Sequence, residues 1–293
     1  MSQGETAVRP QTPAPGVRPR TALGVLALFR SELSITFRRL RTVALLAILA
    51  ALPVLIGVVV RVQVGGGGGG GPAFIAEVTE NGLFLVFTAF VVTLPVFLPM
   101  AVGVVAGDSV AGESGSGTLR YLLVAPAGRT RLLAAKFFAA LVFCAAATLT
   151  VALAALATGA ALFPLGRVTL LSGDSITFWA ALLRTGLIAV LVAASLAGLV
   201  AIGLFVSTLT GSGIAAMATT VGLVITVQIL DGIPQLHAIQ PWLFPHYWLS
   251  FADLLRQPAY LHDVLRNLGL QGLYVAVFGA AAWARFTSRD ITA

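Results

Sequence analysis

Residues 42–60 read TVALLAILAALPVLIGVVV, a run without a single charged side chain. A helix of about 20 apolar residues crosses the roughly 30 Å hydrocarbon core of a bilayer. Because lipid offers no hydrogen-bond partners, every backbone polar group in such a run must bond within its own segment. The stretch therefore predicts a transmembrane helix and, with it, an integral membrane protein.

The composition of the whole chain agrees with this prediction. Its 293 residues are 58% hydrophobic and only 10% charged, with a mean hydropathy of +0.97. A soluble domain usually carries about 25% charged residues, so most of this chain is expected in lipid. In a membrane protein, a net charge of +7 indicates basic cytoplasmic loops rather than nucleic-acid binding.

Further apolar runs follow the first one along the chain. We predict an all-α integral membrane protein with six transmembrane helices, at about 42–60, 83–107, 137–162, 179–208, 214–230 and 268–285. If both termini lie on one side, 13 of the 18 lysines and arginines fall on that side. The positive-inside rule then predicts cytoplasmic termini in a multi-pass protein of the plasma (inner) membrane.

Two segments precede the first expected helix. Residues 1–22 are rich in Pro and Arg and lack the apolar core of a signal peptide, which predicts a disordered cytoplasmic tail. Residues 23–41 repeat apolar side chains every three or four positions, which predicts an amphipathic helix in the headgroup plane. Its arginines, Arg30, Arg38, Arg39 and Arg41, would then lie near anionic lipid. A long cytoplasmic extension of the first transmembrane helix is the alternative.

The segment AGESGSGTLRYLLVAPAGRTR, residues 111–131, separates the second and third expected helices. Its glycines break the second helix, Thr118 can cap a short helix over LRYLLVA, and Pro126 with Gly128 ends it. Apolar side chains and charges on such a helix could dock into a groove of a soluble partner. A solvated loop with positive-inside arginines explains the residues equally well.

Several kinds of chemistry find no support in the sequence. The single lysine, Lys136, follows no glycine-rich turn, so the chain lacks a P-loop for ATP. His237, His246 and His262 lack metal-ligand spacing, and Cys144 is the only thiol, so we predict no metal site and no enzyme activity. Arg184 interrupts the fourth run; it would either snorkel to the outer surface, or pair within the protein or line a substrate path.

The sequence GESGSGTLRYLLVAPAGRTRLLAAK, residues 112–136, resembles the signature of ABC-2-type permeases, the membrane subunits of ATP-binding-cassette exporters. The family pattern falls on Gly112, Glu113, Gly117, Thr118, Leu119, Leu122, Leu123, Pro126, Arg129 and Lys136. The family often has an acidic residue where this chain has Ser116. FRSELSITFRRLRT is similar to the family's N-terminal elbow helix, and ARFTSRDITA to its cytoplasmic tail.

The resemblance implies a permease domain over residues 23–293, with an elbow helix at 23–41 and a cytoplasmic coupling helix between spans two and three. The residues implied to contact the ATPase are Gly112, Glu113, Gly117, Thr118, Leu119, Arg120, Leu122, Leu123, Pro126 and Arg129. A separate ABC ATPase subunit would bind ATP and Mg, so this chain would need no cofactor. A second permease copy or a paralogue, and membrane lipid, are the other implied partners.

The function that the resemblance implies is the export of a hydrophobic or amphipathic substrate, such as a drug, a lipid or a peptide. Few polar groups line the expected spans, which suits such a substrate and is also typical of lipid-facing helices. An ATP-independent channel or secondary carrier is the alternative.

Overall fold

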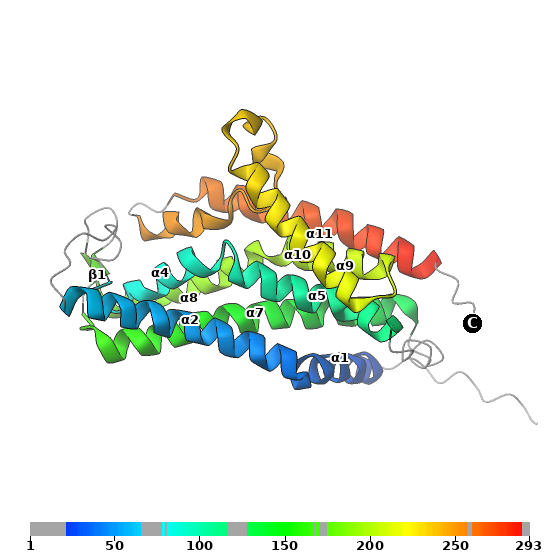
Figure 1. Cartoon of the computed structure of the whole chain (residues 1–293), viewed down its shortest axis with the longest axis horizontal. Coiled ribbons are helices and arrows are strands. Elements are labelled where there is room, and N and C mark those ends of the chain that lie inside the picture. Colours follow the sequence, from blue (N-terminus) through cyan, green and yellow to red (C-terminus); the bar gives the residue numbers. More distant parts are fainter. Residues whose placement is uncertain are drawn as a thin grey trace, which may run out of the picture.

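The computed structural model describes residues 22–65, 78–79, 81–115, 128–166, 168–169, 175–256 and 260–288. Over these ranges, most of the long helices run side by side along a common axis, whereas α10 (Gly213–Asp231) crosses them obliquely and its end projects from the layer (Figure 1). The predicted all-α architecture is confirmed. A single small departure occurs in the described ranges: β1 (Val168–Thr169) pairs antiparallel with β2 (Ser175–Ile176).

The helices keep the order of the apolar runs. They are α1 (Ala22–Arg38), α2 (Leu40–Gly65), α4 (Phe84–Thr93), α5 (Phe97–Gly115), α7 (Arg129–Leu162), α8 (Phe178–Ser195), α9 (Ala197–Leu209), α10 (Gly213–Asp231) and α11 (His262–Ser288). Three 3₁₀ segments, η1 (Pro234–Leu236), η2 (Gln240–Trp242) and η3 (Trp248–Leu255), lie between α10 and α11. Among the described residues, 5 helices are long and apolar enough to cross a membrane, or 6 if a bent pair forms one span.

The bent pair is formed by α4 and α5, whose axes differ by 57°. Pro95 lies in the break between them. A proline has no N–H to donate to the preceding turn, and its ring disfavours helical geometry at the residue before it. The expected second span is therefore two helical pieces rather than one straight helix.

Helix boundaries differ from the apolar runs at the charged residues. The helix α5 continues to Gly115, and α7 begins at Arg129, ahead of the expected start at 137. The third expected span begins at residue 137 because Lys136 interrupts the apolar sequence, yet Lys136 lies inside α7 and is 2% exposed. A charge ends an apolar run in the sequence, but it does not end a helix when partners inside the protein compensate it.

Small residues let the helices approach closely in the core. Gly103 and Gly107 of α5 face α10, and a Cβ atom added at Gly107 would lie 3.0 Å from the Ala216 carbonyl oxygen. The centre of the core is α9, where Leu199 and Val200 are fully buried. It packs along both α5 and α11.

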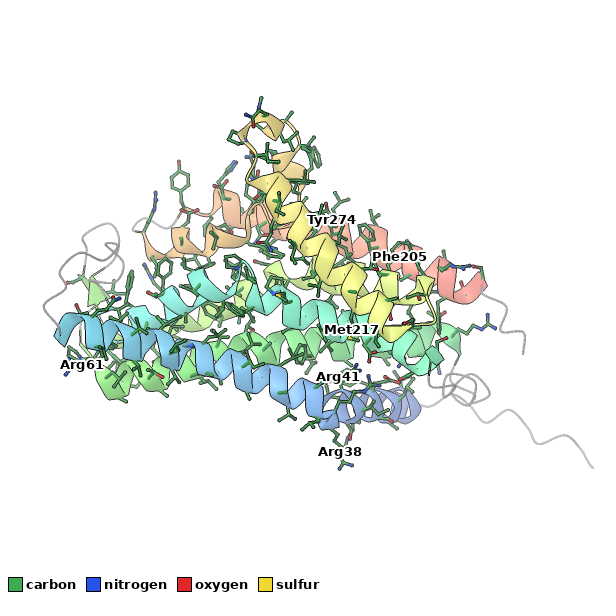
Figure 2. All side chains as sticks on the ribbon, in the orientation of Figure 1. Arg38, Arg41, Arg61, Phe205, Met217 and Tyr274 are labelled. Atoms are coloured by element: carbon green, nitrogen blue, oxygen red, sulfur yellow. The ribbon has the colours of Figure 1, made fainter. Side chains whose placement is uncertain are left out.

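One end of the helix layer gathers several chain segments. The start of α1, the end of α5, the start of α7 and the end of α11 all lie there, opposite β1 (Figure 1). We call this the basal end. Arg38 lies at the basal end, whereas Arg61 lies near the opposite end (Figure 2).

Candidate functional site: an ion-pair network at the basal end

Lys136 joins three helices at the basal end. Its Nζ donates to Glu32 Oε2 of α1 at 2.9 Å and to Glu113 Oε1 of α5 at 2.6 Å. All three side chains are buried, with residue exposures of 2% for Lys136, 4% for Glu32 and 6% for Glu113. A buried charge is costly unless it is paired and hydrogen-bonded, and here each charge has such a partner. The triad therefore cross-links α1, α5 and α7.

The triad carries two acids and one base, and this imbalance affects Glu32. Burial raises the pKa of the Glu32 carboxyl above its ordinary value, because a low-dielectric environment disfavours the charged form. The Lys136 ammonium opposes this shift by attraction and by its hydrogen bond. The ionised state of Glu32 thus depends on Lys136.

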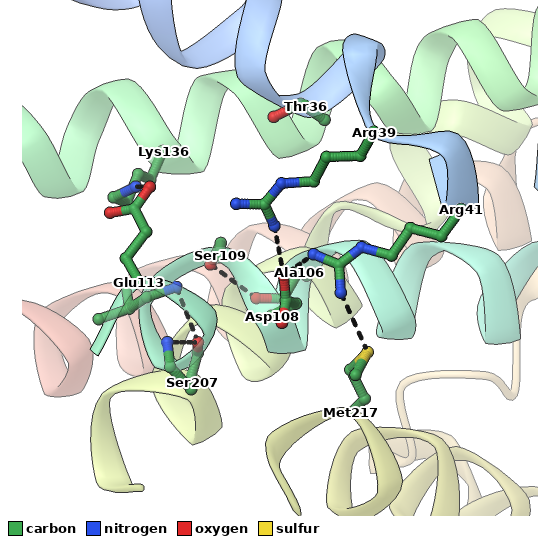
Figure 3. Close-up of polar contacts among 12 residues, drawn as sticks. Thr36, Arg39, Arg41, Ala106, Asp108, Ser109, Glu113, Lys136, Ser207 and Met217 are labelled. Atoms are coloured by element: carbon green, nitrogen blue, oxygen red, sulfur yellow. Dashed lines mark hydrogen bonds and ion pairs between the residues drawn. The ribbon is translucent and has the colours of Figure 1, made fainter. Parts of the chain in front are cut away.

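A second ion-pair cluster lies beside the triad. Asp108 of α5 is 4% exposed and forms salt bridges with Arg39, between α1 and α2, and with Arg41 in the first turn of α2. Figure 3 shows both guanidinium groups converging on the Asp108 carboxylate. Arg41 also approaches the Met217 sulfur of α10, with Nη1 3.9 Å from Sδ.

Together the two clusters form what we call the basal network: Glu32, Arg39, Arg41, Asp108, Glu113 and Lys136. Three carboxylates and three cations balance formally. The network links α1, α2, α5 and α7 and is adjacent to α10, so most of the helices at the basal end share it.

The space within the basal network is too small for an organic ligand. A cavity of about 20 Å³, bordered by Glu32, Arg39, Glu113 and Lys136, has room for about one water molecule. Within the described ranges, no group of three or more His, Cys, Asp and Glu side chains is placed to hold a metal ion. The network therefore suits a mechanical connection between helices better than a binding site.

Backbone contacts hold α5 firmly beside the network. The Ser207 hydroxyl of α9 accepts hydrogen bonds from the Val110 and Ala111 amides, each at 2.9 Å. Gly213 starts α10, and a Cβ atom added there would lie 2.4 Å from Asp108 Oδ1. The same Cβ atom would lie 3.1 Å from Gly112 Cα, so glycine at this position lets the α9–α10 turn close against α5 and the Asp108 carboxylate.

The start of α7 is tied to the end of α11. Arg129 Nη1 donates to the Thr287 carbonyl oxygen at 2.9 Å, and Trp283 Nε1 donates to Thr130 Oγ1 at 3.0 Å. Residues 116–127 connect α5 to α7. On one side of this connection Glu113 is bound into the basal network, and on the other side Arg129 is bound to α11.

The structure describes only part of the sequence-predicted coupling segment. Gly112, Glu113 and Arg129 lie in helices, as given above. The other predicted coupling residues lie outside the described residues: Gly117, Thr118, Leu119, Arg120, Leu122, Leu123 and Pro126. The predicted N-terminal tail, apart from Ala22, also lies outside them.

The arginines predicted to lie at a membrane surface divide into two pairs. Arg30 and Arg38 are exposed on α1, whereas Arg39 and Arg41 are half-buried against Asp108. Arg184, for which the sequence allowed both snorkelling and internal pairing, donates from Nη1 to the Leu254 carbonyl oxygen of η3 at 3.1 Å. That contact favours pairing within the protein.

Sequence reasoning missed the roles of Glu32, Asp108 and Lys136. Glu32 and Lys136 are 104 residues apart, and Asp108 is 69 residues from Arg39. The sequence did contain one signal for these roles: each charged group stands next to a long apolar run. A charge in such a place is expected to need a partner inside the protein. Which partner it takes is a tertiary relation that residue spacing does not encode.

A second buried polar cluster lies where α8 meets α9. Asn267 Nδ2 donates to Ser195 Oγ at 2.6 Å, and Gln271 Nε2 donates to the Phe244 carbonyl oxygen at 2.8 Å. Gln271 Oε1 accepts from the Gly198 amide at 3.2 Å. These side chains bind one another and the backbone, so the cluster fastens α11 to the α8–α9 break.

Comparisons with known proteins place the chain in a family without assigning it an activity. The comparison with curated proteins returned no match. A family model described as "Protein of unknown function (DUF2705)" matches residues 69–292, well over half of the 293 residues. The chain, with its apolar helices and its basal network, therefore belongs to the DUF2705 family.

Proposed function

We propose that this chain is the permease subunit of an ABC exporter of the ABC-2 type. A separate ATPase subunit would bind ATP and Mg, and the permease would form the path for a hydrophobic or amphipathic substrate. The helices that are apolar enough to cross a membrane support the membrane part of this proposal. The ATP-driven part depends on the sequence resemblance and on the basal network.

The observation that carries the proposal is the ion pair between the two helices that flank residues 116–127. The helix before this segment and the helix after it are joined directly by Glu113 and Lys136, at 2.6 Å. Separating a buried ion pair costs several kcal/mol, so α5 and α7 should move together when the segment is pushed. A partner that docks on the segment would then displace α1 and α2 as well, through Glu32 and the Asp108 cluster.

In this proposal the basal end faces the cytoplasm of the plasma (inner) membrane. The helix α1 serves as the elbow helix at the membrane surface, where the exposed Arg30 and Arg38 meet lipid headgroups. Residues 112–129 serve as the coupling element for the ATPase. A second copy of the chain, or a paralogue, completes the path, and rigid-body motion of the helices alternates access to it.

The environment of Lys136 is consistent with ATP binding by a separate partner protein rather than by this chain. Phosphate binding by a P-loop needs a lysine after a glycine-rich turn. The only lysine of this sequence is instead buried between two carboxylates inside α7. Nucleotide hydrolysis is therefore assigned to the partner.

The experiment is co-expression of the full chain with a Walker-type ATPase encoded beside it. In the test variant, residues 117–123 are replaced by a glycine–serine linker of the same length. We expect this variant to lose co-purification of the ATPase and ATP-dependent export. Elution volume and thermal midpoint should stay unchanged, because the replaced residues lie outside the basal network.

A matched control replaces the exposed Arg61, near the opposite end, with Gln, and should leave complex formation intact. Unchanged assembly and transport in the linker variant would refute the proposal. Gradient-driven transport by the chain alone in liposomes would instead support the channel or carrier alternative.

A further inference from the structure

A groove far from the basal network lies between the 3₁₀ segments and the first turns of α11. Its volume is about 510 Å³. Trp242 and Tyr247 form one wall, and Arg266, Leu270 and Leu273 of α11 form the other. Gly269 also borders it, and a Cβ atom added there would meet no atom within 4 Å. The groove is thus open beside α11.

Within the described ranges, Arg266 is the only charged residue that lines this groove, and it is exposed. Among the described residues it has neither an ion pair nor a hydrogen bond with another side chain or with the backbone. The acid nearest to Arg266 in the sequence is Asp263, one turn earlier on α11, but the two form no ion pair, and Asp253 pairs with Arg256, at 3.8 Å. The guanidinium of Arg266 therefore keeps its hydrogen-bond donors unoccupied within the described part of the chain.

The groove becomes less polar from the start of α11 toward its middle. Arg266 lies about one turn inside the start of α11, and Leu270 and Leu273 follow on the same face about 6 and 10 Å further along the axis. Trp and Tyr side chains collect at the boundary between headgroups and acyl chains. Along α11 the groove thus passes from a cation to an apolar floor, with the aromatic wall opposite, which matches the polar-to-apolar order of groups in a phospholipid.

We infer that this groove binds one anionic phospholipid. The guanidinium of Arg266 holds the phosphate, for which its planar donors are well suited. The glycerol region lies against Trp242 and Tyr247, and an acyl chain runs along Leu270 and Leu273. The inference does not depend on the proposed transport function, because none of the groove residues belongs to the basal network or to the coupling segment.

The test measures binding of phosphatidylglycerol to the purified full chain in detergent by native mass spectrometry. Arg266→Gln should weaken binding about fivefold, the factor that corresponds to about 1 kcal/mol for one arginine near an anionic surface. Gly269→Leu should weaken it as well while keeping the charge, since the leucine side chain occupies the groove. This variant should still fold, because leucine favours helix more than glycine does.

Matched measurements separate the sources of phosphate. Arg61→Gln removes an exposed arginine outside the groove and should leave binding unchanged. Phosphatidylcholine should bind more weakly than phosphatidylglycerol, and millimolar inorganic phosphate should not displace the lipid. Equal binding by the wild type and both groove variants, or full displacement by inorganic phosphate, would overturn the inference.

Discussion

Replacing Lys136 by methionine tests whether the basal network holds the helices together. The substitution keeps the length and apolar stem of the side chain but removes the ammonium from between Glu32 and Glu113. Two carboxylates then remain buried without their shared counter-ion. Breaking a buried pair by removing one partner costs about 3–5 kcal/mol, because the remaining charge is uncompensated.

The protein can limit this loss by protonating a carboxyl group. At pH 7, protonating a glutamate with an ordinary pKa near 4.3 costs about 3.7 kcal/mol, and this cost falls by about 1.4 kcal/mol for each unit of lower pH. We therefore expect the Lys136→Met variant to lose about 3–4 kcal/mol of unfolding free energy at pH 7. At pH 5.5 the loss should shrink to about 1.6 kcal/mol by the same relation.

The direction of the pH effect follows from Glu32. Burial raises the pKa of this carboxyl, so the folded state binds its proton more tightly than the unfolded state does. The associated stability is complete below the ordinary pKa and is lost as the pH rises through the raised one. Without the Lys136 ammonium, which opposes the shift, the pKa rises further, and the loss at neutral pH becomes larger.

The assay is chemical unfolding in mixed detergent micelles at pH 7.0 and 5.5. Arg131→Met, on the same helix but outside the network, serves as the control and should change stability by less than about 0.5 kcal/mol. Adding Glu32→Gln and Glu113→Gln to Lys136→Met should recover most of the loss, since no unpaired charge remains. A loss that is equal at both pH values and is not recovered in the triple variant would refute the reasoning.

Two further predictions concern helix contacts. Gly107→Leu should destabilise the protein by about 1–3 kcal/mol, because the α5–α10 crossing has no room for a side chain, whereas Gly222→Leu on the open face of α10 should have little effect. Equal shifts of the thermal midpoint would contradict this. Asn267→Leu should cost about 0.6–1.7 kcal/mol by removing the 2.6 Å hydrogen bond to Ser195. A double-mutant cycle with Ser195→Ala measures that coupling, and a value near zero would contradict the assigned bond.

The all-α membrane architecture could be predicted because an apolar run is judged against a fixed bilayer thickness. Residues 42–60 needed no knowledge of their neighbours to be read as a span, and α2 contains them all. Boundaries were less predictable, since they depend on tertiary pairing. Lys136 interrupts an apolar run in the sequence but lies within the continuous helix α7.

The basal network could be predicted only in part. Glu113 was identified through its place in the coupling motif, but its contact with Lys136 was not. The arginines before the first span were expected to face lipid, because that is how a positive charge beside an apolar run usually lies. Two of them instead face Asp108, a carboxylate whose position depends on how α5 packs against α1 and α2.

The polar face of α11 has a consequence for biogenesis. Over an apolar stretch of 18 residues the mean hydropathy is 1.2 in α11, against 3.0 in α2, so α11 alone is expected to insert into a bilayer less favourably. The polar side chains of Asn267 and Gln271 lower the hydropathy of α11. Their partners Ser195 and Gly198, at the α8–α9 break, come earlier in the chain and are synthesised first. We therefore expect α11 to integrate into a bilayer only after α8 and α9, which supply hydrogen bonds that lipid cannot.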